Sequence, residues 1–212
     1  MLNLFSNPVF IPLLLSSIGI ILWWILSSTT VSEKKSVLNL LVDRVVYFLL
    51  VAFIVNALFN FPEILALPYR SLILSTKALS LSLLIIIAYS YWHYLKESLA
   101  DNKMIVSVFQ LVSLLGLVNQ VYYYFLYKSP LIVGLILLFS GLLLFSSIVT
   151  LKGNGWVYAS MLGLVLHLMV TRNQAVLYFG FVITPELVAL ILAEWGIFLV
   201  ILLRRQRQSE RT

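Results

Sequence analysis

The sequence predicts an all-α, polytopic integral membrane protein, and three observations carry this prediction. Of the 212 residues, 62% are hydrophobic and only 10% are charged, whereas a soluble domain has roughly 25% charged residues. The apolar residues occur in runs of about 20, the length that a helix needs to cross a bilayer. Short polar stretches separate these runs. We therefore expect one membrane-embedded helical-bundle domain over residues 1–212, in the cell membrane and multi-pass.

Seven apolar runs are interpreted as transmembrane helices. In chain order they are Val9–Leu26, Val37–Phe61, Ser71–Tyr94, Met104–Tyr127, Leu131–Leu151, Trp156–Thr171, and a last helix that begins at Thr184 and ends before Arg204. Six helices are the rival count, because the sixth run is short and Asp43 and Arg44 weaken the second.

The ends of these runs carry the residues expected at helix termini and membrane interfaces. The first run ends near the pair Trp23 and Trp24, and the third and fourth end in "YSYWHY" and "VYYYFLY". Tryptophan and tyrosine are enriched at this level of a membrane. At the last helix, Thr184 can cap, Pro185 suits the first helical position and Glu186 faces the positive end of the helix dipole. The stretches "SSTTVSEKKS", "LKESLADNK", "KSP" and "KGNG" are expected to be loops or turns.

The basic residues set the predicted orientation. With seven helices and a cytoplasmic C-terminus, ten of the fourteen Lys and Arg residues fall on or near the cytoplasmic side and four on the other. The four are Arg70, Lys77, Lys128 and Arg172. An excess of Lys and Arg marks the cytoplasmic side, so we predict an N-terminus outside and a C-terminus inside.

Two apolar segments are too short to span and fall on the outer side in this topology. They are Phe61–Tyr69 and Ala175–Ile183. We expect each to lie in the interface or to enter the membrane and return, as non-helical backbone does where protein or water covers it. Asn60 and Glu63 resemble a capping box that opens a short helix after Pro62.

Polar residues gather at the outer ends of five predicted helices. An isolated charged side chain at the centre of a transmembrane helix costs about 2.5–3.5 kcal/mol on insertion scales. Several such groups are therefore expected to face one another or a water-filled cavity. The candidate site residues are Asn56, Glu63, Arg70, Lys77, Asn119, His167, Arg172 and Glu186.

Each candidate has a functional and a structural interpretation. Arg70, Lys77 and Arg172 can hold an anionic group, although Arg70 and Arg172 can equally anchor to lipid headgroups.

His167 and Glu186 are the candidate proton-transfer groups, but a histidine bonded across helices and a helix-capping glutamate are the alternatives. Asn56 and Asn119 are either substrate contacts or hydrogen-bonding links between helices. Glu63 is a cap or a partner for Lys77.

Several classes of function are disfavoured. The chain has no cysteine and only two histidines, which excludes thiol chemistry and makes a transition-metal site improbable. We expect no cofactor. The net charge of +6 is explained by membrane topology, so we expect no nucleic-acid partner.

Three functions remain open. The first is a polar cavity in the extracytoplasmic half that binds, and modifies or transfers, an anionic lipid or lipid-linked substrate. The second is a non-catalytic membrane subunit, assembly factor or sensor that acts through partner membrane proteins. A small-solute transporter ranks lower, because no internal repeat is visible and the polar residues lie away from the midplane.

Overall fold

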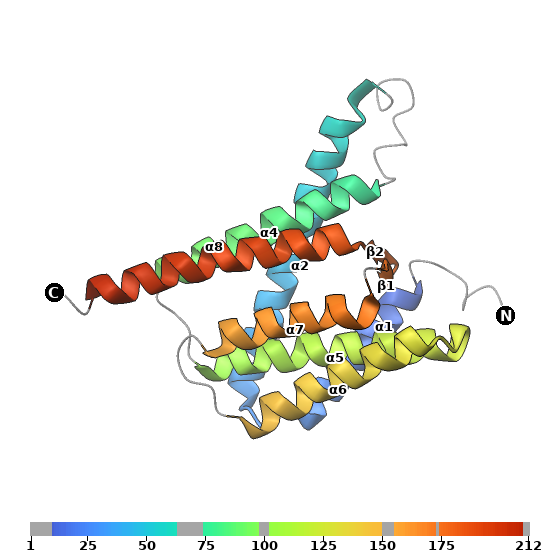
Figure 1. Ribbon diagram of the computed structural model, residues 1–212, viewed down its shortest axis with the longest axis horizontal. Coiled ribbons are helices and arrows are strands. Elements are labelled where there is room, and N and C mark those ends of the chain that lie inside the picture. Colours follow the sequence, from blue (N-terminus) through green and yellow to red (C-terminus); the bar gives the residue numbers. More distant parts are fainter. Residues whose placement is uncertain (1–9, 63–73, 98–101, 150–154, 173, 210–212) are drawn as a thin grey trace. The chain divides into compact units, whose positions relative to one another are not determined.

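The computed structural model describes residues 10–62, 74–97, 102–149, 155–172 and 174–209, which form seven helices and one β-hairpin (Figure 1). In order the elements are α1 (Phe10–Leu26), α2 (Val31–Phe59), α4 (Thr76–Glu97), α5 (Asn102–Tyr127), α6 (Pro130–Ile148), α7 (Gly155–Thr171), β1 (Val176–Tyr178), β2 (Phe181–Ile183) and α8 (Pro185–Ser209). The predicted helical class is confirmed, apart from the hairpin.

Four of the described helices are long and apolar enough to cross a membrane. They are α2, α5 from Met104, α6, and α8 as far as Arg204. Helices α1 and α7 are also apolar but have only 17 residues each. The structure thus supports a helical membrane protein, while seven spans and the predicted orientation stay predictions.

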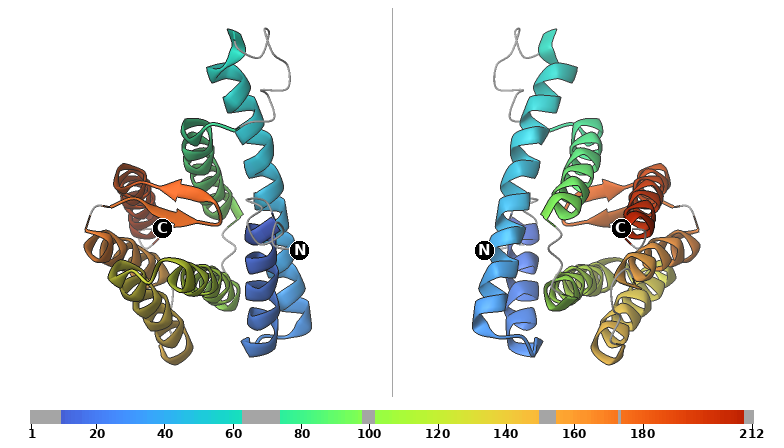
Figure 2. Two further views of the ribbon diagram at one scale, coloured as in Figure 1. Left: turned by 90° about the vertical axis from the view of Figure 1, so that its right-hand side faces the viewer. Right: turned by 90° about the vertical axis from the view of Figure 1, so that its left-hand side faces the viewer.

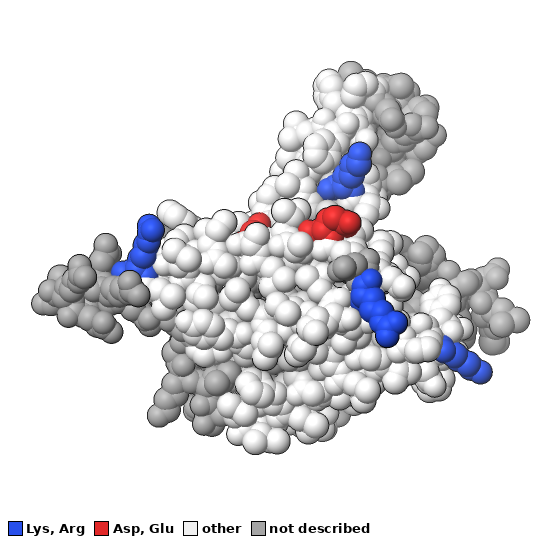
Figure 3. Space-filling view, in the orientation of Figure 1, with Lys and Arg blue, Asp and Glu red and all other residues white. Residues whose placement is uncertain are grey.

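Large apolar side chains on the outside of the helices fit this interpretation. Ile25 is 70% exposed, Phe125 74% and Ile148 78%. Figure 3 shows that Lys, Arg, Asp and Glu side chains are sparse over the described surface that faces the viewer. Because exposing this much apolar surface to water is energetically unfavourable, these faces are expected to contact lipid.

The chain divides into two compact units. The first comprises residues 1–34 and 100–188, and the second comprises residues 35–99 and 189–212. In the first unit α5 packs against both α1 and α6, α6 also packs against α7, and β1 contacts α5. A single bundle over the whole chain stays a prediction.

Close helix packing around α5 depends on small residues. A Cβ atom on Gly19 of α1 would meet Leu115 Cδ2 at 2.7 Å, and one on Gly116 of α5 would meet Phe139 Cε1 at 2.5 Å. Small residues let helix backbones approach closely inside a membrane, where no hydrophobic effect drives helices together. Gly19 and Gly116 therefore position α1 and α6 against α5.

The predicted loop over residues 27–36 is wrong in its second half, because α2 begins at Val31. Thr30 and Glu33 form a capping box: the Thr30 backbone N–H donates to Glu33 Oε2 at 2.8 Å, and the Glu33 N–H donates to Thr30 Oγ1 at 3.3 Å. These two bonds satisfy N–H groups that a helix start leaves unpaired. The Thr-x-x-Glu spacing was visible in the sequence and signals this helix start.

Lys34 closes the turn between α1 and α2. Its side chain is 9% exposed, and Nζ donates to the Trp24 carbonyl at 2.7 Å. The same ammonium group lies 5.8 Å from the centre of the Trp24 ring. Trp24 belongs to the last turn of α1, whose carbonyls lack partners within the helix, so the cation completes this helix end.

The predicted ends of three other helices also need correction. Helix α4 begins at Thr76 and ends at Glu97, rather than running from Ser71 to Tyr94. Helix α8 does not stop before Arg204 but continues to Ser209. Arginine and glutamine are good helix formers in water, so the helix can continue beyond the apolar run. Helix α6 ends at Ile148, where the extended backbone of Val149 follows, rather than at Leu151.

The segment from Val176 to Ile183 forms an antiparallel hairpin, shown by the paired arrows in Figure 2. Val176 pairs with Ile183, Leu177 with Val182, and Tyr178 with Phe181. The two turn residues, Phe179 and Gly180, have φ angles of 48° and 84°. Positive φ at both positions is typical of the two-residue turn that matches the twist of a β-hairpin. The depth of this hairpin in the membrane stays a prediction.

Candidate functional site

The candidate site lies at one end of the first unit, where α5, α6 and α7 meet the hairpin (Figure 1). The C-terminal ends of α5 and α7 and the start of α6 lie at this end, which the predicted topology places outside. Proline at the first position of α6 favours its start after Ser129.

Two amides of α5 hold the hairpin. Asn119 is completely buried, and its Oδ1 accepts a hydrogen bond from the backbone N–H of Phe179 at 2.8 Å. The neighbouring Gln120 is also buried, and its Nε2 donates to the carbonyl of Leu177 at 3.4 Å. A buried backbone N–H or carbonyl without a partner is costly. Asn119 and Gln120 therefore stabilise the backbone of a hairpin that is too short to stabilise itself.

Tyrosines of α5 extend this contact toward the turn. The hydroxyl of Tyr123 lies close to the backbone of Gly180. The Tyr123 ring is stacked on that of Tyr127, with 6.0 Å between their centres. Asn119, Tyr123 and Tyr127 share the i, i+4 spacing of one helix face. The polar stripe on α5 therefore faces the hairpin.

His167 of α7 contacts the same hairpin through Tyr178. The distance from His167 Nε2 to the Tyr178 hydroxyl is 2.8 Å, and the Phe139 ring packs edge-on against Tyr178 at 6.0 Å. Burial raises the pKa of the Tyr178 hydroxyl above its ordinary value, so Tyr178 keeps its proton near neutral pH. His167 Nδ1 is buried and has no hydrogen-bond partner within the described part of the chain.

In the second unit, Asn56 links α2 to the start of α4. The side chain is completely buried. Its Oδ1 accepts hydrogen bonds from the backbone N–H of Ser75 at 3.1 Å and from Nδ2 of Asn60 at 2.9 Å. Ser75 in turn caps α4, because its Oγ accepts the Ala78 N–H at 3.2 Å. Asn56 thus performs the linking role that was its structural alternative.

The charged candidates are placed differently from the amides. Lys77 lies in the first turn of α4 with an exposed side chain. Arg172 follows the last residue of α7, is exposed, and has a φ of 49°, the left-handed conformation common just after a helix. Glu186 is exposed in the first turn of α8. Glu63 and Arg70 lie outside the described residues, as does most of the segment 61–69, so the predicted capping box of Asn60 and Glu63 is described only at Asn60.

Glu186 belongs to the start of α8, as its sequence context predicted. The Thr184 Oγ1 atom accepts the Leu187 N–H at 3.3 Å. The Glu186 carboxylate lies close to its own backbone N–H and to the Thr184 side chain. Among the described residues, no hydrogen bond or ion pair joins Glu186 to His167. A role of either residue in proton transfer stays a prediction.

Metal binding gains no support either. Within the described ranges, no three His, Asp or Glu side chains lie close enough together to hold a metal ion. The described side-chain groups that bond to the hairpin are amides and one imidazole.

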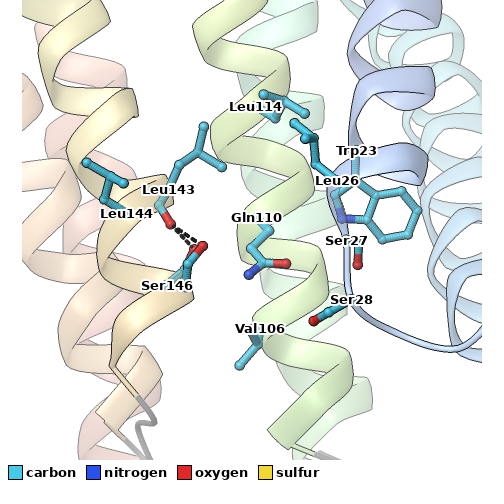
Figure 4. Close-up of a pocket in the computed structure, with 11 residues that line it drawn as sticks. Trp23, Leu26, Ser27, Ser28, Val106, Gln110, Leu114, Leu143, Leu144 and Ser146 are labelled. Carbon is cyan, nitrogen blue, oxygen red and sulfur yellow. Dashed lines mark hydrogen bonds between the residues drawn. The ribbon is translucent and has the colours of Figure 1, made fainter.

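Sequence reasoning missed a second feature, a pocket of about 510 Å³ between α1, α5 and α6 (Figure 4). None of the predicted site residues lines it. Its lining includes Trp23, Gln110 and Ser146. Polar residues from three distant parts of the chain, spaced singly among leucines, carry no motif that could reveal a pocket.

No protein-family model matches the chain, and neither a curated protein nor a solved structure does.

Proposed function

We propose that the protein is a multi-pass membrane protein that binds an anionic lipid, or a lipid-linked substrate, at its extracytoplasmic end. The observation behind this proposal is the position of the hairpin. Helix α5 holds it at the end of the first unit where two exposed cations, Lys128 and Arg172, each follow a helix. Lys128 follows α5 and Arg172 follows α7. An anionic headgroup would be held by these cations, while its acyl chains contact the apolar helix faces.

The exposed cations support an anionic ligand. Lys128 and Arg172 have φ angles of 47° and 49°, so both occupy the left-handed position that ends a helix. Each cation near an anionic membrane surface contributes about 1 kcal/mol to binding. Both residues also complement the negative ends of their helix dipoles, so a headgroup would share them with the helix ends.

The outer strand of the hairpin supports insertion among lipids. Phe181 is 37% exposed and Val182 is 43% exposed. The opposite strand contains Val176, which is buried, and the hairpin backbone is held by Asn119. An apolar strand on a fixed support is suited to lie at the acyl boundary beside a headgroup site.

The test is retention of phosphatidylglycerol by the purified protein, measured by native mass spectrometry. The variant Lys128→Asn/Arg172→Asn removes both cations, and asparagine tolerates the left-handed conformation of each position. Losing two contributions of about 1 kcal/mol each should weaken binding roughly 25-fold.

Lys35→Asn is the matched control, because Lys35 is an exposed lysine in the first turns of α2, on the side predicted to be cytoplasmic. It should retain phosphatidylglycerol as the unchanged protein does. Equal retention by the double variant would contradict the proposal.

A second candidate is a non-catalytic subunit that acts through partner membrane proteins. It is favoured by the contacts of Asn119, Gln120 and His167, each of which bonds to the hairpin. Side chains used in this way stabilise a fold and carry no reaction. Recovery of a defined complex after extraction in a mild detergent would support this candidate, whereas a lone chain that binds phosphatidylglycerol would favour the first.

A further inference from the structure

The pocket in the first unit is a site separate from the hairpin. It lies between the C-terminal end of α1, the first half of α5 and the C-terminal end of α6. Its volume of about 510 Å³ falls within the range of small-molecule sites. Its polar lining residues are Trp23, Ser27, Ser28, Gln110, Ser146 and Ser147, and the other residues that line it are apolar.

Trp23 supplies a hydrogen-bond donor without an acceptor. Its side chain is 2% exposed, and its indole Nε1 has no partner among the described residues. Figure 4 shows this nitrogen on the side of the ring that faces α5 across the pocket. A buried N–H without an acceptor costs about 1–3 kcal/mol. An occupant with a carbonyl or hydroxyl oxygen would remove this cost.

The opposite wall supplies acceptors. Ser146 and Ser147 on α6 both donate their hydroxyl protons to the Leu143 carbonyl, at 2.8 and 2.9 Å. Their oxygens keep lone pairs that can accept a hydrogen bond. The carboxamide of Gln110, which Figure 4 shows between the two walls, offers both a donor and an acceptor and makes no hydrogen bond to any described residue.

The lining also defines the charge and the apolar part of an occupant. No lining residue is charged, so a phosphate or carboxylate would be buried without a counter-charge, which is costly. Leu26 and Leu144 line the pocket and are 71% and 63% exposed. Apolar chains that leave the pocket would therefore pass along exposed leucines.

We propose that this pocket binds the glycerol backbone of an uncharged diacylglycerol. An ester carbonyl accepts from Trp23 Nε1, and the free hydroxyl of the glycerol donates to the α6 serines or Gln110. The two acyl chains extend past the exposed leucines into the membrane. This site is distinct from the anionic-lipid site by both position and charge.

The test uses a radiolabelled diacylglycerol with a diazirine beside the ester, photolysed with the full-length protein in nanodiscs. Crosslinks should map to α1, α5 and α6. Unlabelled dioleoylglycerol should compete, and dioleoylphosphatidylglycerol should not. Trp23→Phe keeps an aromatic ring but removes the donor, and it should weaken binding roughly three- to tenfold. Ser146→Leu replaces a hydroxyl of the pocket wall by a bulkier apolar side chain and should reduce labelling.

Trp156→Phe is the matched control, because Trp156 is also 2% exposed with an unpartnered Nε1 but does not line the pocket. It should leave labelling unchanged. Labelling of Trp23→Phe at the level of the unchanged protein, or equal competition by dioleoylphosphatidylglycerol, would overturn the proposal. If Ser146→Leu does not fold, Trp23→Phe and the competition decide the result.

Discussion

Replacing Gly116 by alanine tests whether the packing of α5 on α6 supports the hairpin. A Cβ atom at this position would meet three atoms of the Phe139 ring, at 2.5, 2.6 and 2.9 Å. The ring must move, and it packs against Tyr178, which is bonded to His167. The substitution therefore disturbs both the helix contact and the hairpin.

The expected loss of stability is measured against a second glycine-to-alanine change in the same pair of helices. Overpacking costs about 1–3 kcal/mol, whereas the change from glycine to alanine stabilises a helix by about 0.5–1 kcal/mol. Gly141 of α6 has no atom within 4 Å of an added Cβ, so Gly141→Ala shows the helix effect alone. We expect Gly116→Ala to be less stable than Gly141→Ala by about 1–3 kcal/mol.

The measurement is reversible unfolding of both variants in mixed detergent micelles, followed by circular dichroism. Limited proteolysis at the hairpin turn reports the local effect, and Gly116→Ala should be cleaved faster than Gly141→Ala. Equal stability and equal cleavage of the two variants would refute the described contact between α5 and α6.

Three further predictions concern buried polar contacts. Asn119→Leu leaves the amide of the hairpin turn without its acceptor and should destabilise the protein by about 1–2 kcal/mol, with faster hydrogen exchange at that amide. Asn56→Leu should have an effect of similar size but should raise exchange at the start of α4; unchanged exchange there would contradict the link. Lys34→Met should cost about 1–2 kcal/mol in thermal unfolding, whereas Lys35→Met, at an exposed neighbouring position, should have almost no effect.

Local sequence patterns were sufficient to predict the helices and several of the residues at which they begin or end. The run from Met104 to Tyr127 matches α5 within two residues, and Thr184 caps α8 as predicted. These features depend on apolar length, capping chemistry and proline geometry, which act between near neighbours. The capping box of Thr30 and Glu33 was also visible in the sequence. The region was nevertheless predicted to be a loop.

The hairpin could not be identified in the same way. A run such as "AVLYFGFVI" is too short to span, but its two strands become stable only because Asn119 and Gln120 complete their backbone hydrogen bonds. Those partners are 57 and 60 residues away in the sequence. The sequence showed that Asn119 is polar in an apolar helix, but not which group it bonds.

Composition and the length of the apolar runs are properties of each segment alone, so the amino-acid sequence was sufficient to predict a helical protein with segments that could cross a membrane. The contacts of the polar residues, in contrast, depend on how the helices pack. Asn56 and Asn119 complete backbone hydrogen bonds of other elements, while Lys77 and Arg172 remain exposed. The tertiary structure also brought Trp23 together with Gln110 and Ser146 around one pocket. Such choices depend on helix rotation and neighbour contacts, which spacing along one helix does not specify.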